Sequence, residues 1–195
     1  YDMYINDEKI LSVGNNDPNN YQDATVNRMV SFSPDENGMA TILIAVNNES
    51  HFYSGMIFPP ILGTVESVDF ICGIRTSLRL CWIFLFLVSA FISLYLWKKT
   101  HYRNALYFFI LCITMIGWTS YPIIHVIATL PVFPTYLFEM LFCYLTLFML
   151  VLLHNQICEA NRISALVSNI TSASFCVLIA LYILFSKYLS KSSSK

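Results

Sequence analysis

Residues 104–158 read NALYFFILCITMIGWTSYPIIHVIATLPVFPTYLFEMLFCYLTLFMLVLLHNQIC, and this stretch decides the fold. Its 55 residues carry one formal charge, on Glu139. A membrane helix needs about 20 mainly apolar residues, because the hydrocarbon core is about 30 Å thick and each residue rises about 1.5 Å. The stretch is therefore long enough for two such helices. Pro131 and Pro134 lie near its middle and predict the turn between them.

Two further runs have no formal charge, residues 80–97 and 163–186, and each predicts one more membrane helix. We place the four spans near 79–97, 105–128, 133–155 and 163–186, within a transmembrane domain of residues 71–195. Over the whole chain, 56% of residues are hydrophobic and 12% are charged, about half the charged share of a soluble domain. This composition excludes a disordered chain and an ordinary soluble enzyme, and no region is basic enough for a nucleic-acid groove.

The net charge of −1 hides an uneven distribution. Residues 1–70 hold ten acids and two bases, whereas residues 71–195 hold nine bases and two acids. Three bases, Lys98, Lys99 and Arg103, follow the first span, and the positive-inside rule predicts that their loop is cytoplasmic. The amino-terminal domain of a multi-pass cell-membrane protein would then be extracytoplasmic. Four spans also return the three lysines of residues 187–195 to the outside, so we expect the chain to stop before its fold is complete.

Residues 1–70 have the pattern of an extracytoplasmic β-rich domain and its linker. Residues 1–14 predict two strands joined by a polar turn, residues 27–34 alternate like a half-buried strand, and residues 39–48 are rich in β-branched side chains. Turns are predicted at 15–23 and 35–38, and a helix that opens at 64–68 would run into the first span. Four or five strands predict a partial, jelly-roll-like β-sandwich, completed by a neighbour or by further chain. The fold class is therefore this sandwich followed by four transmembrane helices.

Glu139 is the most informative single residue, because a charged side chain at the centre of a membrane helix costs about 2.5–3.5 kcal/mol. His125 lies at a similar depth on the other side of the predicted turn, so the two side chains are candidates for a pair that senses a ligand or protons. The alternatives are a structural hydrogen bond between helices, or a carboxylate that reaches the membrane surface.

Other candidates surround this pair. Pro122 interrupts the backbone hydrogen bonds of the second span, and it is either a hinge that transmits movement or a static kink. Gly117, Thr119 and Ser120 precede it and would allow close packing or satisfy freed carbonyl groups. Trp118, Tyr121 and Tyr136 either line a ligand pocket or belong to the aromatic belts at the membrane surfaces.

The chain shows no recognisable enzyme motif. The six cysteines form no C-x-x-C pair, the four histidines are scattered, and a phosphate-binding loop, a nucleophile elbow and paired catalytic carboxylates are all missing from the sequence. We therefore expect no catalytic residues, no metal and no cofactor.

Several short motifs together carry a family resemblance: MYINDEKILSVG at 3–14, ILIAVNN at 42–48, HFYSGMIFPPILGTVESV at 51–68 and LYLWKKTHYRNALYFFILCIT at 94–114. The chain thus resembles the bacterial seven-transmembrane receptors with diverse intracellular signalling modules. The matching positions are Asn47, Gly55, Leu62, Gly63, Lys98, Arg103, Leu106, Tyr107 and Phe108. The chain departs from the family in having four of seven spans and no kinase, cyclase or phosphatase module.

The resemblance implies a receptor fragment that senses a small extracytoplasmic ligand, by analogy a carbohydrate, and relays binding through the helices to an output module absent from this chain. An alternative is a structural or accessory subunit of a larger membrane complex. A third is a proton-coupled transporter that uses Glu139 and His125 as a relay. The expected partners are the lipid bilayer, the small ligand, and a second copy or neighbouring membrane proteins.

Overall fold

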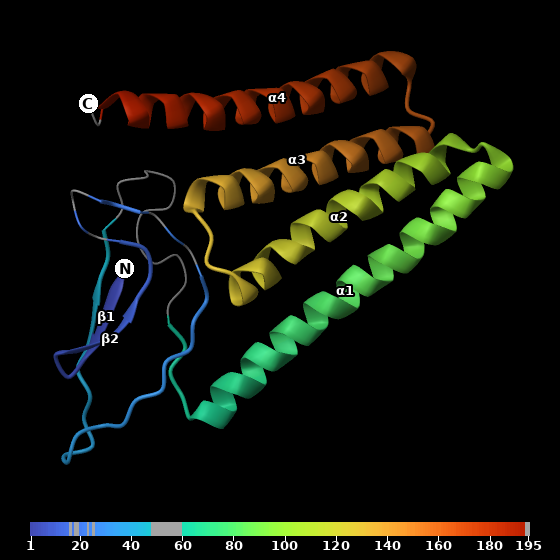
Figure 1. Cartoon of the computed structure of the whole chain (residues 1–195). Helices are drawn as coiled ribbons and strands as arrows, with labels where there is room; N and C mark the ends of the chain where they lie inside the picture. Colours follow the sequence, from blue (N-terminus) through green and yellow to red (C-terminus); the bar gives the residue numbers. More distant parts are fainter. Residues whose placement is uncertain (16, 18–19, 23, 25, 48–59, 194–195) are drawn as a thin grey trace. The chain divides into compact units, whose positions relative to one another are not determined.

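The computed structural model of the chain describes residues 1–15, 17, 20–22, 24, 26–47 and 60–193 (Figure 1). The chain divides into two compact units, residues 1–74 with 122–136, and residues 75–121 with 137 onwards. The elements follow in the order β1 (Asp2–Ile5), β2 (Glu8–Ser12), β3 (Ile42–Ala45), α1 (Val65–Thr100), α2 (Arg103–Ile127), α3 (Val132–Ile157) and α4 (Arg162–Ser193).

The three strands form one small antiparallel sheet in the order β2-β1-β3. The predicted polar turn joins β1 to β2 at Asn6 and Asp7, whose φ angles of 48° and 66° suit short polar side chains. The register places Ile5 opposite both Glu8 and Ile42. Ile5 and Val13 are the buried apolar residues at this end of the chain, with 4% and 5% of their surfaces exposed. Ile5, at the centre of the sheet, is therefore part of the small buried core of this unit.

The prediction of four or five strands in a partial sandwich is wrong for the described residues, which contain a sheet of three strands and no second sheet. Residues 27–34 alternate as predicted but form no strand. The Asn27 amide donates to the His125 carbonyl oxygen of α2 at 2.9 Å instead of to a neighbouring strand. Seven of the eight side chains of residues 27–34 are exposed, so the alternating pattern does not correspond here to a half-buried strand.

The predicted turn at residues 35–38 is present and lies shortly before β3 in the chain. The Asp35 carboxylate accepts hydrogen bonds from the Asn37 and Met39 amides at 2.9 and 2.8 Å. Gly38 has a φ of 75°, a conformation that glycine adopts without a steric penalty. The predicted loop at 15–23 is described only in part, where Asn15 and Gln22 form an isolated antiparallel bridge.

Four helices in the described residues are long and apolar enough to cross a membrane, which confirms the four predicted spans. The helix α1 is longer than its predicted span of 79–97, because it begins at Val65 as the Thr64 hydroxyl accepts a hydrogen bond from the Ser67 amide at 3.3 Å. Its 36 residues measure about 54 Å, against about 30 Å of hydrocarbon. The charged first turns, which hold Glu66 and Asp69, therefore extend beyond the apolar span.

The helices are joined by short connections (Figure 1). At the end of α1, the His101 amide donates to the Trp97 carbonyl at 2.8 Å and His101 takes a φ of 53°, which ends the helix. Pro131 lies in the connection between α2 and α3, as predicted, whereas Pro134 lies in the first turn of α3, where a missing amide hydrogen is tolerated. Glu159 has a φ of 47° in the connection to α4.

The sheet core supports a first prediction. Ile5→Ala should lower the opening free energy of the sheet by about 2–5 kcal/mol, because it removes a buried side chain and leaves a cavity. Hydrogen exchange of the strand amides in the full chain measures this loss. Ile10→Ala is the matched control, since Ile10 lies on β2 with 40% of its surface exposed. Equal effects of the two substitutions would contradict the assignment of the core.

Candidate functional site

The predicted site residues lie on two consecutive helices. Trp118, Tyr121, Pro122 and His125 belong to α2, and Tyr136 and Glu139 belong to α3. Trp118, Tyr121 and Glu139 fall in the unit that contains most of the helices, whereas Pro122, His125 and Tyr136 fall in the unit that contains the sheet. The division passes between Tyr121 and Pro122, directly before the proline.

Tyr121 and Glu139 are brought together by a hydrogen bond between their side chains. Both residues are partly buried, and Glu139 lies seven residues, or about 10 Å, along α3 from Val132. A phenol hydroxyl can donate to a carboxylate or accept from a neutral carboxylic acid, so the link can persist in either charge state of Glu139. Both residues were candidates from the sequence, but Glu139 was paired with His125, and Tyr121 was grouped with Trp118 and Tyr136.

His125 is buried, with 5% of its surface exposed. Its backbone carbonyl accepts the hydrogen bond from Asn27, one of the carbonyl groups that the end of a helix leaves without an intrahelical donor. The neighbouring Val26 is also buried, at 7% exposed. Residues 26 and 27 thus pack against the last turn of α2. The predicted pairing of His125 with Glu139 joins residues of the two units and stays a prediction.

Pro122 lies inside the continuous helix α2 and removes the amide hydrogen that would bond to the Trp118 carbonyl. The Thr119 and Ser120 hydroxyl groups were expected to bond to carbonyl groups that Pro122 frees, but they bond to carbonyl groups one turn earlier. Thr119 donates to the carbonyl groups of Met115 and Ile116, and Ser120 donates to that of Gly117 at 2.8 Å. Back-bonding of this kind bends helices slightly. The turn before Pro122 is therefore the part of α2 with the most altered backbone bonding.

Gly117 is a point of close contact between α2 and α3. A Cβ atom built on Gly117 would lie 2.2 Å from Cδ1 of Phe142, which is shorter than any real carbon contact. The Phe142 ring in turn lies against Phe138, with ring centroids 4.6 Å apart. Close packing at Gly117 was predicted from its small size, but its aromatic partner on α3 was not. The sequence offers no spacing rule that pairs residues across a turn of unknown geometry.

A polar contact between α3 and α4 was missed by the sequence reasoning. The Asn155 side-chain amide donates to the Ser168 hydroxyl at 2.7 Å and to the side-chain oxygen Oδ1 of Asn169 at 2.8 Å. Hydrogen bonds between membrane helices contribute about 0.6 kcal/mol each on average. This contact could have been predicted, since Asn155 lies at the end of the third predicted span and Asn169 lies near the start of the fourth.

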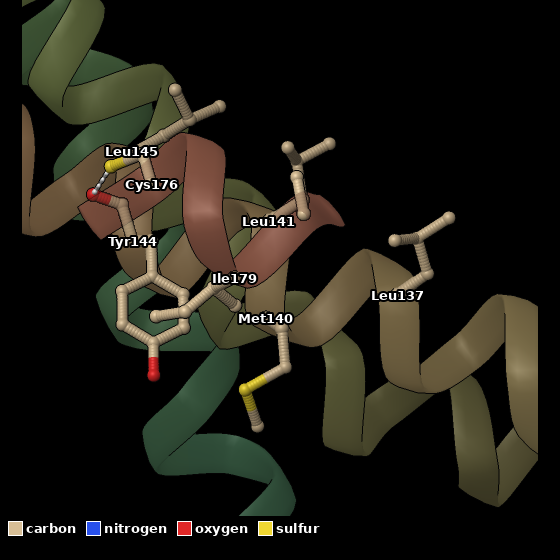
Figure 2. Close-up of a pocket in the computed structure, with 8 residues that line it drawn as sticks. Leu137, Met140, Leu141, Tyr144, Leu145, Cys176 and Ile179 are labelled. Atoms are coloured by element: carbon tan, nitrogen blue, oxygen red, sulfur yellow. Dashed lines mark hydrogen bonds between the residues drawn. The ribbon is translucent and has the colours of Figure 1, made fainter. Parts of the chain in front are cut away.

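The cavities along α3 and α4 are apolar (Figure 2). One, of about 40 Å³, is lined by leucine, methionine and isoleucine side chains, and beside it Cys176 donates to the Tyr144 carbonyl at 3.4 Å. The next, of about 250 Å³, is lined by Phe148, Phe175 and their neighbours. Apolar linings of this kind suit hydrocarbon rather than a sugar. The predicted pocket of Trp118, Tyr121 and Tyr136 stays a prediction, and Trp118 has 40% of its surface exposed.

The topology residues Lys98, Lys99 and Arg103 surround the connection between α1 and α2, and all three side chains are exposed. Two lysines in the last turn of α1 also interact favourably with its dipole. Among the described residues, no group of three or more His, Cys, Asp or Glu side chains is placed to hold a metal ion.

Comparisons with known proteins place the chain in no family. No family model, curated protein or solved structure matches it. The resemblance to bacterial seven-transmembrane receptors therefore rests on the quoted motifs alone.

The contact at Gly117 supports a second prediction. Gly117→Ala should destabilise the helical unit by about 1–3 kcal/mol, because the added methyl group overlaps Phe142. Reversible unfolding of the full chain in lipid nanodiscs measures the change. Gly73→Ala is the control, since a Cβ atom at Gly73 in α1 meets no atom within 4 Å.

A double substitution tests the cause of this destabilisation. Phe142→Ala removes the overlapping ring, so the further cost of Gly117→Ala should fall close to zero in that background. An unchanged cost with alanine at position 142 would show that the loss does not come from the contact between α2 and α3.

Proposed function

We propose that this chain is the membrane-embedded sensory part of a receptor. Its amino-terminal region takes part in binding a small ligand, by the resemblance a carbohydrate, and the binding is relayed through α2 to an output module outside these 195 residues. The observation that carries the proposal is the hydrogen bond from the Asn27 amide to the His125 carbonyl, 2.9 Å long. It joins the segment between β2 and β3 to the end of a membrane helix.

The first step of the proposed relay is a mechanical link. Val26 and His125 are both buried, and they belong to the same compact unit as the sheet. A shift of residues 26–28 on ligand binding would therefore break or displace a bond at the last turn of α2. An unpaired carbonyl in a buried helix end costs about 1–3 kcal/mol, so the helix end is expected to follow the segment.

The second step is a change in the direction of α2. Pro122 lies three residues before His125 and weakens the backbone bonding between the last turn and the rest of the helix. The residue directly before the proline, Tyr121, holds the Glu139 side chain on α3. Movement at Pro122 would thus alter the contact between α2 and α3. Such a relay needs two states with different ligand affinities, and bent and straight forms of α2 are our candidates for them.

A subunit of a larger membrane complex is the second candidate function. It is favoured by α4, in whose apolar window no residue is buried within the described chain. The small sheet of three strands also leaves room for a neighbour to extend it. Cross-linking in native membranes separates the candidates, because a subunit would be recovered bound to a defined partner in the absence of any sugar.

The sensor proposal is tested with Trp118 as the only tryptophan. Trp82→Phe and Trp97→Phe leave this side chain one turn before Pro122. Neutral mono- and disaccharides are added to the full chain in nanodiscs, and both tryptophan emission and thermal unfolding are followed. We expect a saturable emission change together with stabilisation, which is about 2.7 kcal/mol at 100 times the Kd. Failure of every sugar to change either quantity would contradict carbohydrate sensing.

Two substitutions at one position test the relay itself. Asn27→Pro removes the amide hydrogen that bonds to His125, so the sugar should still stabilise the protein while the Trp118 emission no longer responds. Asn27→Ala keeps the amide and should respond like the unchanged chain. A full emission response in the Asn27→Pro protein would contradict a relay through this bond.

A further inference from the structure

The described residues carry an exposed basic cluster at the connection between α1 and α2, which we call the basic turn: Lys98, Lys99, His101, Tyr102 and Arg103. All five side chains are exposed, and Tyr102 has 62% of its surface exposed. Three of them carry a permanent positive charge within six residues. None of these three forms a salt bridge with another described residue.

The basic turn has a defined shape. The Thr100 hydroxyl donates to the Leu96 carbonyl at 2.7 Å and accepts from the Tyr102 amide at 3.3 Å. The Asn104 side-chain amide donates to the Tyr102 hydroxyl at 3.0 Å. These bonds fix the backbone from which the bases project, so less conformational entropy is lost when they bind an anion than in a free loop.

The position of the basic turn along the two helices determines which anions it can contact. The helix α1 is apolar up to Trp97, and α2 becomes apolar again at Ala105, so the basic turn begins and ends where the two helices leave the hydrocarbon. Tyrosine side chains favour the headgroup level, as do long basic side chains at helix ends. Charges held at this level meet phosphodiester groups rather than solutes of the bulk phase.

The connection between α3 and α4 reinforces the same charge. In a chain with four spans, the α1–α2 and α3–α4 connections lie on the same side of the membrane, since two spans separate them. Arg162 opens α4 with an exposed side chain, and neither α2 nor α4 has an acidic residue in its first turn. The single acid of this connection is Glu159. The two connections together therefore carry an excess of positive charge.

We propose that the basic turn is a binding surface for the headgroups of anionic phospholipids, and that Lys98 and Lys99 provide most of its selectivity. Each Lys or Arg near a membrane surface contributes about 1 kcal/mol to attraction of anionic lipid, a factor of about five in binding. The surface would set the lipid composition around the helix pair whether or not the amino-terminal region binds a sugar.

The test counts the lipids that stay on the protein. The full chain is placed in nanodiscs of phosphatidylcholine and phosphatidylglycerol. It is then released from the discs, and native mass spectrometry measures the mass of the protein with its bound lipids. We expect phosphatidylglycerol to be enriched over its share in the disc. In the double variant Lys98→Gln and Lys99→Gln, the ratio of bound phosphatidylglycerol to bound phosphatidylcholine should fall toward the ratio in the disc, by up to about 25-fold at low salt.

Two matched variants control for charge and folding. Lys9→Gln with Arg28→Gln removes two exposed bases that lie outside the four helices and should leave the enrichment unchanged. Lys98→Arg with Lys99→Arg keeps the charge and should also retain it. The proposal is overturned if the unchanged chain shows no enrichment, or if the Lys9 and Arg28 pair loses as much as the Lys98 and Lys99 pair.

Discussion

The lack of water in the bilayer core is the constraint on which the rest of this structure depends. A backbone amide or carbonyl group in hydrocarbon must bond within the protein, so each apolar run has to form a complete helix. The described residues contain four such helices. The constraint also explains why polar side chains such as those of Thr119, Ser120 and Asn155 bond to backbone or to one another.

The same constraint weakens where the helices end. At the last turn of α2, the His125 carbonyl takes its hydrogen bond from Asn27, a residue far away in the sequence. Pro122 has already removed one bond of the helix ladder nearby. The helix end is thus held partly by the segment between β2 and β3. This dependence is the physical basis of the proposed relay, because a change in that segment acts directly on α2.

Much of this fold could be predicted from sequence, and particular residues show why the rest could not. Charge-free runs identified the four helices, and Pro131 identified the connection between α2 and α3. Alternation at 27–34 was wrongly predicted to be a strand, since a local pattern determines neither the partner that accepts the hydrogen bonds nor whether another layer covers the apolar side chains, which are largely exposed here. Gly117 and Tyr121 were named, but Phe142 and Glu139 as their partners depend on how two helices pack, which a local pattern does not determine.

In the proposed arrangement of four spans, the β2–β3 segment and the connection after α3 lie on opposite sides of the membrane. Two single-cysteine proteins test this directly: one keeps only Cys158, and the other carries Met39→Cys, at a position with 69% of its surface exposed. A maleimide that cannot cross membranes is added to sealed vesicles of known orientation. We predict that each cysteine is labelled from a different side. Labelling of both from the same side would contradict the four-span arrangement and the relay built on it.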